Sequence, residues 1–234
     1  MLKLVQFHPA FGSRNLSPYC LKLETYLRMT GIAHELVWNS DPSKAPKGKL
    51  PYIIDGDLVM GDSVLIIDYL KEKHGDPLDG ALTAEQKAQL VAWRSLFEES
   101  LMFPILHARW IDPAGWAKMK TLFDRMPRLL RLIISGIVRK GVRKQLFAQG
   151  MGRHTQDEIY RFGLQYLAAI ETQLGDKRFM LGETPTSLDA TAYGFLANLV
   201  HTDFDNPLNH KARTTPSFAA YCARIKHGYF ADLQ

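Results

Sequence analysis

The 234-residue sequence contains little cysteine and no long uncharged run. Its two cysteines, Cys20 and Cys222, cannot build a disulfide framework, and they predict a reducing, cytoplasmic location. The longest stretch without Asp, Glu, Lys or Arg covers 13 residues, 190–202. A helix needs about 20 apolar residues to cross a bilayer, so this stretch is too short.

The sequence also lacks clustered metal ligands, and its charge is unevenly distributed. The eight histidines are scattered, with no His-x₃-His pair and no Cys partner arrangement, so we expect no metal site. The net charge of +5 is concentrated between Asp112 and Gly150, where nine Lys and Arg stand against two Asp. Such a segment can attract anionic substrates, membranes or nucleic acid. It lacks the interleaved aromatic and basic residues of a nucleic-acid module, so we expect no nucleic-acid partner.

Apolar periodicity divides the chain into two parts. The first part predicts strands at 3–7, 33–38, 51–54 and 58–60, helices at 17–31 and 62–74, and a polar loop at 39–49. The second part predicts only helices, at 84–110, 114–149 with an interruption at Pro127, 155–174, 187–201 and 214–226. We expect an α/β domain at 1–75, a linker at 76–83 and an all-helical bundle domain at 84–234.

The segment Ser17-Pro18-Tyr19-Cys20 opens the first predicted helix. Serine is a good N-cap and proline suits the first helical position. The same geometry places a hydroxyl and backbone N–H groups at the positive end of a helix, where a thiolate is stabilised. A free thiol with a pKa of about 8.5 is only about 3% ionised at pH 7, and making it mostly thiolate requires about 2.7 kcal/mol. One hydrogen bond and a helix terminus can supply that energy, so Ser17 is our candidate donor to a substrate thiolate.

Two further segments follow at the starts of later elements. Leu50-Pro51 opens a strand, and X-Pro is the linkage at which a cis peptide is accessible, although proline at the start of an edge strand is an equally simple interpretation. Asp62-Ser63 opens a helix, where capping alone would account for both residues.

These three segments in this order resemble the N-terminal half of bacterial-type glutathione S-transferases, and 16–32 looks closest to the branch with failed-axon-connections and metaxin-like proteins. The segment 179–189 resembles the family's helical-domain signature, with Thr186 as N-cap and Asp189 as its capping-box partner in a structural role. The resemblance implies a thioredoxin-like domain (β-α-β-β-β-α), glutathione as co-substrate, a small hydrophobic electrophile and a homodimer.

Several site residues follow from the resemblance alone. It implies that a cis Leu50-Pro51 presents the Leu50 backbone to the cysteinyl part of glutathione. It implies that Asp62 and Ser63 hold the γ-glutamyl group, and that Lys49, with Lys47 as a second candidate, meets the glycyl carboxylate. It places the electrophile between the domains, with candidate residues Phe11, Met102, His107, Arg109, Trp110 and Trp116.

The sequence also departs from the family. Phe7 stands at the end of the first strand, so the tyrosine-type mechanism has no candidate there, and the loop 8–16 is long and could add an anion contact through Arg14. Cys20 shares an apolar face with Leu23 and Leu27, which favours a buried structural thiol, while a mixed disulfide with glutathione is the alternative.

The resemblance implies a glutathione transferase, which stabilises the glutathione thiolate with Ser17 and conjugates it to the electrophile, as the first functional hypothesis. A non-catalytic binding or scaffold protein is the second, since the metaxin-like branch includes members not known for transferase activity. The segment 125–144 interleaves apolar and basic residues and fits either a membrane-surface helix or a core helix of the bundle with a basic outer face. We favour the bundle helix.

Overall fold

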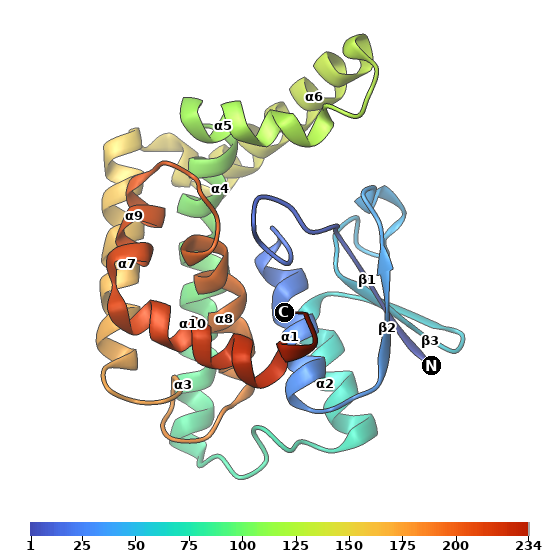
Figure 1. The fold of residues 1–234 in the computed structure, drawn as a ribbon, viewed down its shortest axis with the longest axis vertical. Helices are drawn as coiled ribbons and strands as arrows, with labels where there is room; N and C mark the ends of the chain where they lie inside the picture. Colours follow the sequence, from blue (N-terminus) through green and yellow to red (C-terminus); the bar gives the residue numbers. More distant parts are fainter. Residues whose placement is uncertain (234) are drawn as a thin grey trace.

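The computed structural model describes residues 1–233, and it opens with a four-stranded mixed sheet (Figure 1). The strands are β1 (Leu2–Gln6), β2 (His34–Trp38), β3 (Tyr52–Asp55) and β4 (Leu58–Gly61), in the spatial order β2-β1-β3-β4. β1 runs parallel to β2 and antiparallel to β3. Tyr52 lies opposite both Val5 and Gly61, so the loops that follow β1, precede β3 and follow β4 meet at one end of the sheet.

Two helices of the N-terminal part pack against this sheet. They are α1 (Pro18–Met29) and α2 (Ser63–His74), and Figure 1 shows them between the sheet and the C-terminal helices. α1 forms because Ser17 caps it and apolar residues follow at helical spacing. Its residues Leu23 and Leu27 are fully buried with Leu4 and Ile53 of the sheet. A short 3-10 turn, η1 (Pro42–Lys44), lies in the polar loop before β3.

The remainder of the described chain is helical. Its elements are α3 (Ala84–Ser95), the π-helical segment η2 (Leu96–Leu101), α4 (Met102–Trp110), α5 (Pro113–Met119), η3 (Lys120–Phe123), α6 (Arg128–Gln149), η4 (Met151–Arg153), α7 (Gln156–Leu174), α8 (Ser187–Val200), α9 (Pro207–Thr214), α10 (Pro216–Tyr229) and η5 (Ala231–Leu233). The predicted fold class, a thioredoxin-like α/β part followed by a helical part, is confirmed.

α8 is the buried central helix of the second part, and it packs directly on α1. The backbones come so close that a Cβ at Gly194 would lie 2.5 Å from the Pro18 carbonyl oxygen. Thr186 caps α8 as predicted, and the buried Asp189 carboxylate accepts the Thr186 N–H at 2.8 Å. The Tyr221 hydroxyl donates to the same carboxylate at 2.9 Å, which ties α10 to the start of α8.

The structure corrects the favoured interpretation of segment 125–144. α6 is not a core helix, because Ser135 and Leu146 are its only buried residues. Its first half carries exposed leucines and isoleucines, and Figure 1 shows α6 at one end of the long axis, beside α5. The interruption predicted at Pro127 is confirmed, since Pro127 immediately precedes α6. No helix within residues 1–233 combines the length and the apolar character that a membrane crossing requires.

Candidate active site

Ser17 lies at the N-terminus of α1 in the cap position. Its backbone is extended (φ −81°, ψ 115°), and its hydroxyl oxygen accepts the Cys20 N–H at 3.3 Å. A serine hydroxyl that accepts a hydrogen bond still has its own proton to donate. Ser17 is only half-buried, so this proton can be directed towards a ligand at the positive end of the helix.

The loop before Ser17 is held by Asn15, which sequence reasoning missed. The fully buried Asn15 side chain accepts the Ser17 N–H at 3.0 Å and donates to the Phe7 carbonyl at 2.7 Å. Asn15 therefore links the end of β1 to the start of α1. A polar residue two positions before a helix cap is a weak sequence signal, because such residues also occur in solvated turns.

The helical part supports this loop from the other side. Arg109 of α4 donates to the Leu16 carbonyl at 2.7 Å and to the backbone and side-chain oxygens of Asn198, both at 3.0 Å. Asn198 of α8 in turn donates to the Asn15 carbonyl at 3.0 Å. Burial lowers the pKa of Arg109 to about 10, which leaves the guanidinium charged at neutral pH. Arg109 was expected to line an electrophile pocket, but it supports the backbone beside Ser17 instead.

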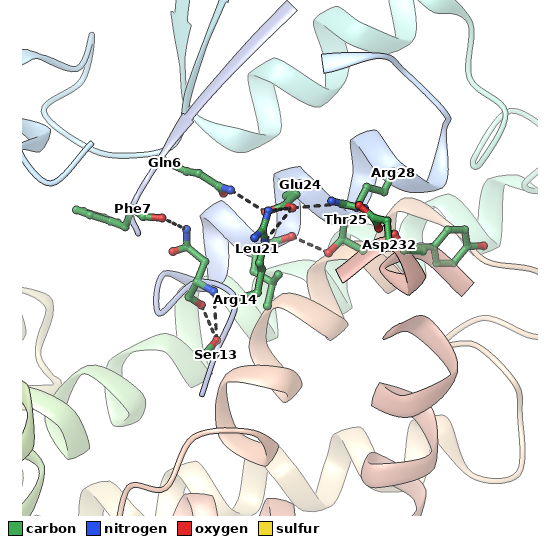
Figure 2. Close-up of polar contacts among 11 residues, drawn as sticks. Gln6, Phe7, Ser13, Arg14, Leu21, Glu24, Thr25, Arg28 and Asp232 are labelled. Atoms are coloured by element: carbon green, nitrogen blue, oxygen red, sulfur yellow. Dashed lines mark hydrogen bonds and ion pairs between the residues drawn. The ribbon is translucent and has the colours of Figure 1, made fainter. Parts of the chain in front are cut away.

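Figure 2 shows a second buried cluster on the sheet side of α1, centred on Glu24. The Glu24 carboxylate is fully buried and accepts hydrogen bonds from Gln6 at 2.7 Å, Arg14 at 3.0 Å and Arg28 at 3.2 Å. Arg14 also lies over the ring of Trp38, 5.0 Å from its centroid. Glu24 and Arg28 stand four residues apart on α1, and the carboxylate of their ion pair is buried. The ion pair between Arg14 and Glu24 holds the loop 8–16 against α1.

Cys20 is fully buried one turn into α1. Burial raises the pKa of its thiol to about 12, and the Ser17 hydroxyl only partly offsets this effect. Burial likewise raises the pKa of Cys222 in α10. A neutral, enclosed thiol is a poor nucleophile, so the geometry agrees with the structural role that the sequence favoured for Cys20.

The Leu50-Pro51 peptide is cis, as the resemblance implies. The buried Leu50 side chain packs with Cys20, Val5 and Ala45, which places this peptide beside the first turn of α1. The preceding loop approaches β4 closely, because a Cβ at Gly61 would lie 3.7 Å from the Lys47 backbone nitrogen. Lys47 and Lys49 are both exposed at this edge of the sheet.

Asp62 and Ser63 begin α2 next to that loop. Asp62 is exposed and has a positive φ of 86°, which is uncommon outside glycine, and its carboxylate accepts the Val64 N–H at 2.9 Å. Ser63 is buried, and its hydroxyl oxygen accepts a hydrogen bond from Lys22 at 3.1 Å. Asp62 therefore faces solvent, whereas the Ser63 hydroxyl faces the interior.

Lys22 is a buried cation that the sequence pattern did not reveal. It lies on α1 and forms an ion pair with Glu98 of η2, with 2.6 Å between Nζ and Oε1. Burial lowers the pKa of Lys22, while the Glu98 charge opposes that shift. The Tyr19 hydroxyl donates to the Glu98 carbonyl at 3.0 Å. Lys22 thus links α1 to the start of α2 through Ser63 and to the helical part through Glu98.

The electrophile-pocket candidates lie in separate packing groups. Phe11 is in a turn with Gly12, where both residues have positive φ, and its ring packs edge-on against Phe204 with the centroids 5.6 Å apart. His107 is buried against Tyr160, and Trp110 lies beside Trp116. Among residues 1–233, no ring contact or hydrogen bond joins Phe11 to His107 or Trp110. That these three residues line one electrophile pocket therefore stays a prediction.

The geometry defines a thioredoxin-like domain whose first helix is capped by Ser17, joined to a helical bundle, and the comparisons identify its family. Family models for the glutathione S-transferase N-terminal and C-terminal domains match residues 18–115 and 163–225. The chain is 34% identical to the isoprene-epoxide glutathione S-transferase of a Rhodococcus strain, over 98% of this chain and 99% of that protein. The chain belongs to the glutathione S-transferase family.

Other relatives agree with the branch that the sequence indicated. Failed axon connections of Drosophila melanogaster is 32% identical over 99% of this chain and 59% of that protein, and Metaxin-1 of Mus musculus is 29% identical over 90% and 69%. Solved structures share the fold. The β-etherase LigF of Sphingobium has a TM-score of 0.65 at 20% identity, over 96% of this chain and 94% of that one. A Methylobacterium radiotolerans glutathione S-transferase solved with glutathione sulfonate has a TM-score of 0.59 at 20% identity, over 99% and 93%.

Proposed function

We propose that this protein is a glutathione transferase that binds glutathione at the start of α1, stabilises its thiolate with Ser17 and adds the thiolate to a small electrophile. The observation that carries the proposal is Ser17 in the cap position, half-exposed and fixed from behind by Asn15. A donor held in place before the reaction stabilises a thiolate without having to reorganise.

The remaining contacts are assigned to the parts of glutathione. The Leu50 backbone pairs with the cysteinyl part, and the α2 N-terminus with Asp62 receives the γ-glutamyl group. Ser63 contributes its backbone N–H, because its hydroxyl is buried against Lys22 in the interior. Lys49, with Lys47 nearby, meets the glycyl carboxylate. Since the Rhodococcus relative is named for isoprene epoxide, strained small epoxides are the first electrophiles to test.

The reaction needs no covalent enzyme intermediate. The glutathione thiol loses its proton to solvent, the Ser17 hydroxyl donates to the sulfur, and the thiolate attacks an epoxide carbon while the carbon–oxygen bond breaks and the alkoxide takes up a proton. The protein supplies thiolate formation and proximity.

The test compares Ser17→Ala with Cys20→Ala. We expect Ser17→Ala to lower kcat by up to about 100-fold, which corresponds to the loss of about 2.7 kcal/mol of thiolate stabilisation, with glutathione affinity changed little. Titration calorimetry gives the affinity, and the ultraviolet absorbance of the bound thiolate against pH should show its pKa rising towards the free value. Cys20→Ala should retain activity. Full activity in Ser17→Ala with none in Cys20→Ala would instead establish cysteine-dependent thiol transfer.

A non-catalytic binding protein is the second candidate, and the exposed apolar face of α6 favours it, because a surface of that kind serves an interaction. Calorimetry of the wild-type protein with reduced glutathione at two temperatures separates the candidates. Micromolar to low-millimolar binding supports the transferase, and no heat at either temperature supports the binding protein.

A further inference from the structure

The first half of α6 exposes a line of large apolar side chains. Leu129, Ile133 and Ile137 follow each other at intervals of four residues, and their exposed fractions are 75%, 58% and 64%. Leu130 and Leu132 flank the line and are also at least half exposed. Soluble monomers rarely display contiguous apolar surface of this kind without using it.

Cations accompany this line, and anions are missing from it. Between Arg125 and Lys144 the chain has seven Arg and Lys and no Asp or Glu. Lys140 and Lys144 continue the line of Ile137 along the helix at helical spacing. Both lysines are exposed, and neither has a hydrogen-bond or ion-pair partner among the residues that the structure describes.

The remaining face of α6 is already occupied. Arg139 donates to the Trp110 and Ile111 carbonyls at 2.9 and 3.0 Å, and Leu146 is buried against α4 and α7. The helix is therefore docked by one side, and the apolar line points away from the bundle. Figure 1 places α6 at one end of the molecule's long axis, where a flat surface can reach it.

Charge decides which occupant fits. A second copy paired through this face would bring two cationic segments together, and like charges at close range oppose association. A bilayer with anionic headgroups supplies both an apolar interior for the leucines and isoleucines and negative charge for the lysines. We propose that the α6 face docks the protein peripherally on anionic phospholipid bilayers, with α6 parallel to the membrane plane.

The two halves of α6 take different parts in this contact. Leu129, Ile133 and Ile137 enter the boundary between headgroups and acyl chains, while Lys140 and Lys144 extend along the surface to the phosphates. This docking uses none of the residues assigned to glutathione, so it can hold or fail independently of the proposed transferase activity.

Co-sedimentation with vesicles tests the proposal. Wild-type protein should bind phosphatidylcholine–phosphatidylserine vesicles at physiological salt at least about tenfold better than pure phosphatidylcholine vesicles. The variant Leu129→Ser/Ile133→Ser/Ile137→Ser should lose this binding, and Lys140→Glu/Lys144→Glu should weaken it. Because all five side chains are exposed, the variants should retain the wild-type circular dichroism. A matched control is Val59→Ser/Val91→Ser, which removes two apolar side chains of about 50% exposure from β4 and α3 and should bind like wild type.

Three outcomes would overturn the proposal. The first is no vesicle binding by the wild-type protein at physiological salt. The second is equal binding to neutral and anionic vesicles, which would remove the role of the lysines. The third is a wild-type dimer that does not bind vesicles and that Leu129→Ser/Ile133→Ser/Ile137→Ser converts to a monomer. This result would assign the face to a second copy of the chain.

Discussion

Two residues at the start of α1 are candidates for thiol chemistry: Ser17 as a hydrogen-bond donor to a bound thiolate, and Cys20 as a thiol itself. Their environments differ. Ser17 is half-exposed at the N-terminus of α1, whereas Cys20 is enclosed by Val5 and Leu50. The same helix terminus cannot activate both positions, because desolvation of a thiolate outweighs one hydrogen bond from Ser17. In the proposed transferase reaction, the reactive thiol is therefore that of glutathione and not that of Cys20.

We expect both protein thiols to be unreactive in the folded state. Cys20 has a pKa raised to about 12 by burial, so a thiol reagent at pH 8 should titrate less than one cysteine in native protein and both in urea. The same shift makes stability depend on pH. The buried thiol stays protonated between its unfolded value and about 12, so its contribution to stability is complete below the unfolded pKa and is lost as pH rises through that window.

Cys222→Ala serves as the control for this measurement, because it leaves Cys20 as the only thiol. A rapid stoichiometric reaction of Cys20 at pH 8 in this folded variant would contradict the assignment and would revive the mixed-disulfide alternative.

Among the elements, the contact between α1 and α8 decides how close the two parts of the molecule come. A Cβ at Gly194 would lie 2.5 Å from the Pro18 carbonyl oxygen and 3.0 Å from the Lys22 nitrogen. Both atoms belong to the backbone of α1, so neither can move without shifting the helix that carries Ser17.

We expect Gly194→Ala to lower the free energy of unfolding by about 1–3 kcal/mol, because overpacking forces the helices apart. Urea denaturation measures this loss. Gly136→Ala is a matched control within α6, where an added Cβ meets nothing within 4 Å. Since alanine favours a helix over glycine, the control should be neutral or more stable by up to about 1 kcal/mol. Equal effects of the two substitutions would disprove the close-contact explanation.

The same elements show what the sequence could and could not reveal. The positions of the strands along the chain followed from alternation, and the starts of α1 and α8 followed from Ser17 and Thr186, which are local signals. α9 was missed although Asn206 and Pro207 are a good cap and first residue, because the helix is only eight residues long. α6 was assigned to the core because its basic and apolar periodicity suits a buried face and an exposed face equally well.

The candidate site divides in the same way. Ser17, Leu50, Pro51, Asp62 and Ser63 lie at or just before the first residues of strands and helices, and sequence patterns mark such positions. Lys22 and Glu98 were missed, and Arg109 was assigned to the electrophile pocket, because each acts through a partner more than 70 positions away in the sequence. Only the packing of α1 on the helical part shows that these charged residues are buried.

At the scale of the whole molecule, the two parts share one core across α1. Leu21 of α1 is buried in the cluster of the C-terminal helices, while Ala190 of α8 is buried in the cluster of the sheet. The Lys22–Glu98 ion pair and the Arg109–Leu16 hydrogen bond cross the same boundary. Breaking one partner of a buried pair leaves an uncompensated charge, so separating the two parts is unfavourable in both its polar and its apolar contacts.

We therefore expect the chain to unfold as one cooperative unit and residues 1–83 alone not to fold. Without the helical part, the fragment exposes Leu21 and leaves Lys22 without Glu98. The fragment should show no cooperative urea transition by circular dichroism. In the full-length protein, amide hydrogen exchange should give β1 and α8 the same free energy of opening, because each needs the other to remain closed.

A fragment with a native-like sheet spectrum and a sigmoidal transition, or a β1 that stays protected after α8 has exchanged, would show two independent domains. The support that Arg109 gives to Ser17 would then be a contact between separable parts and not part of a single core.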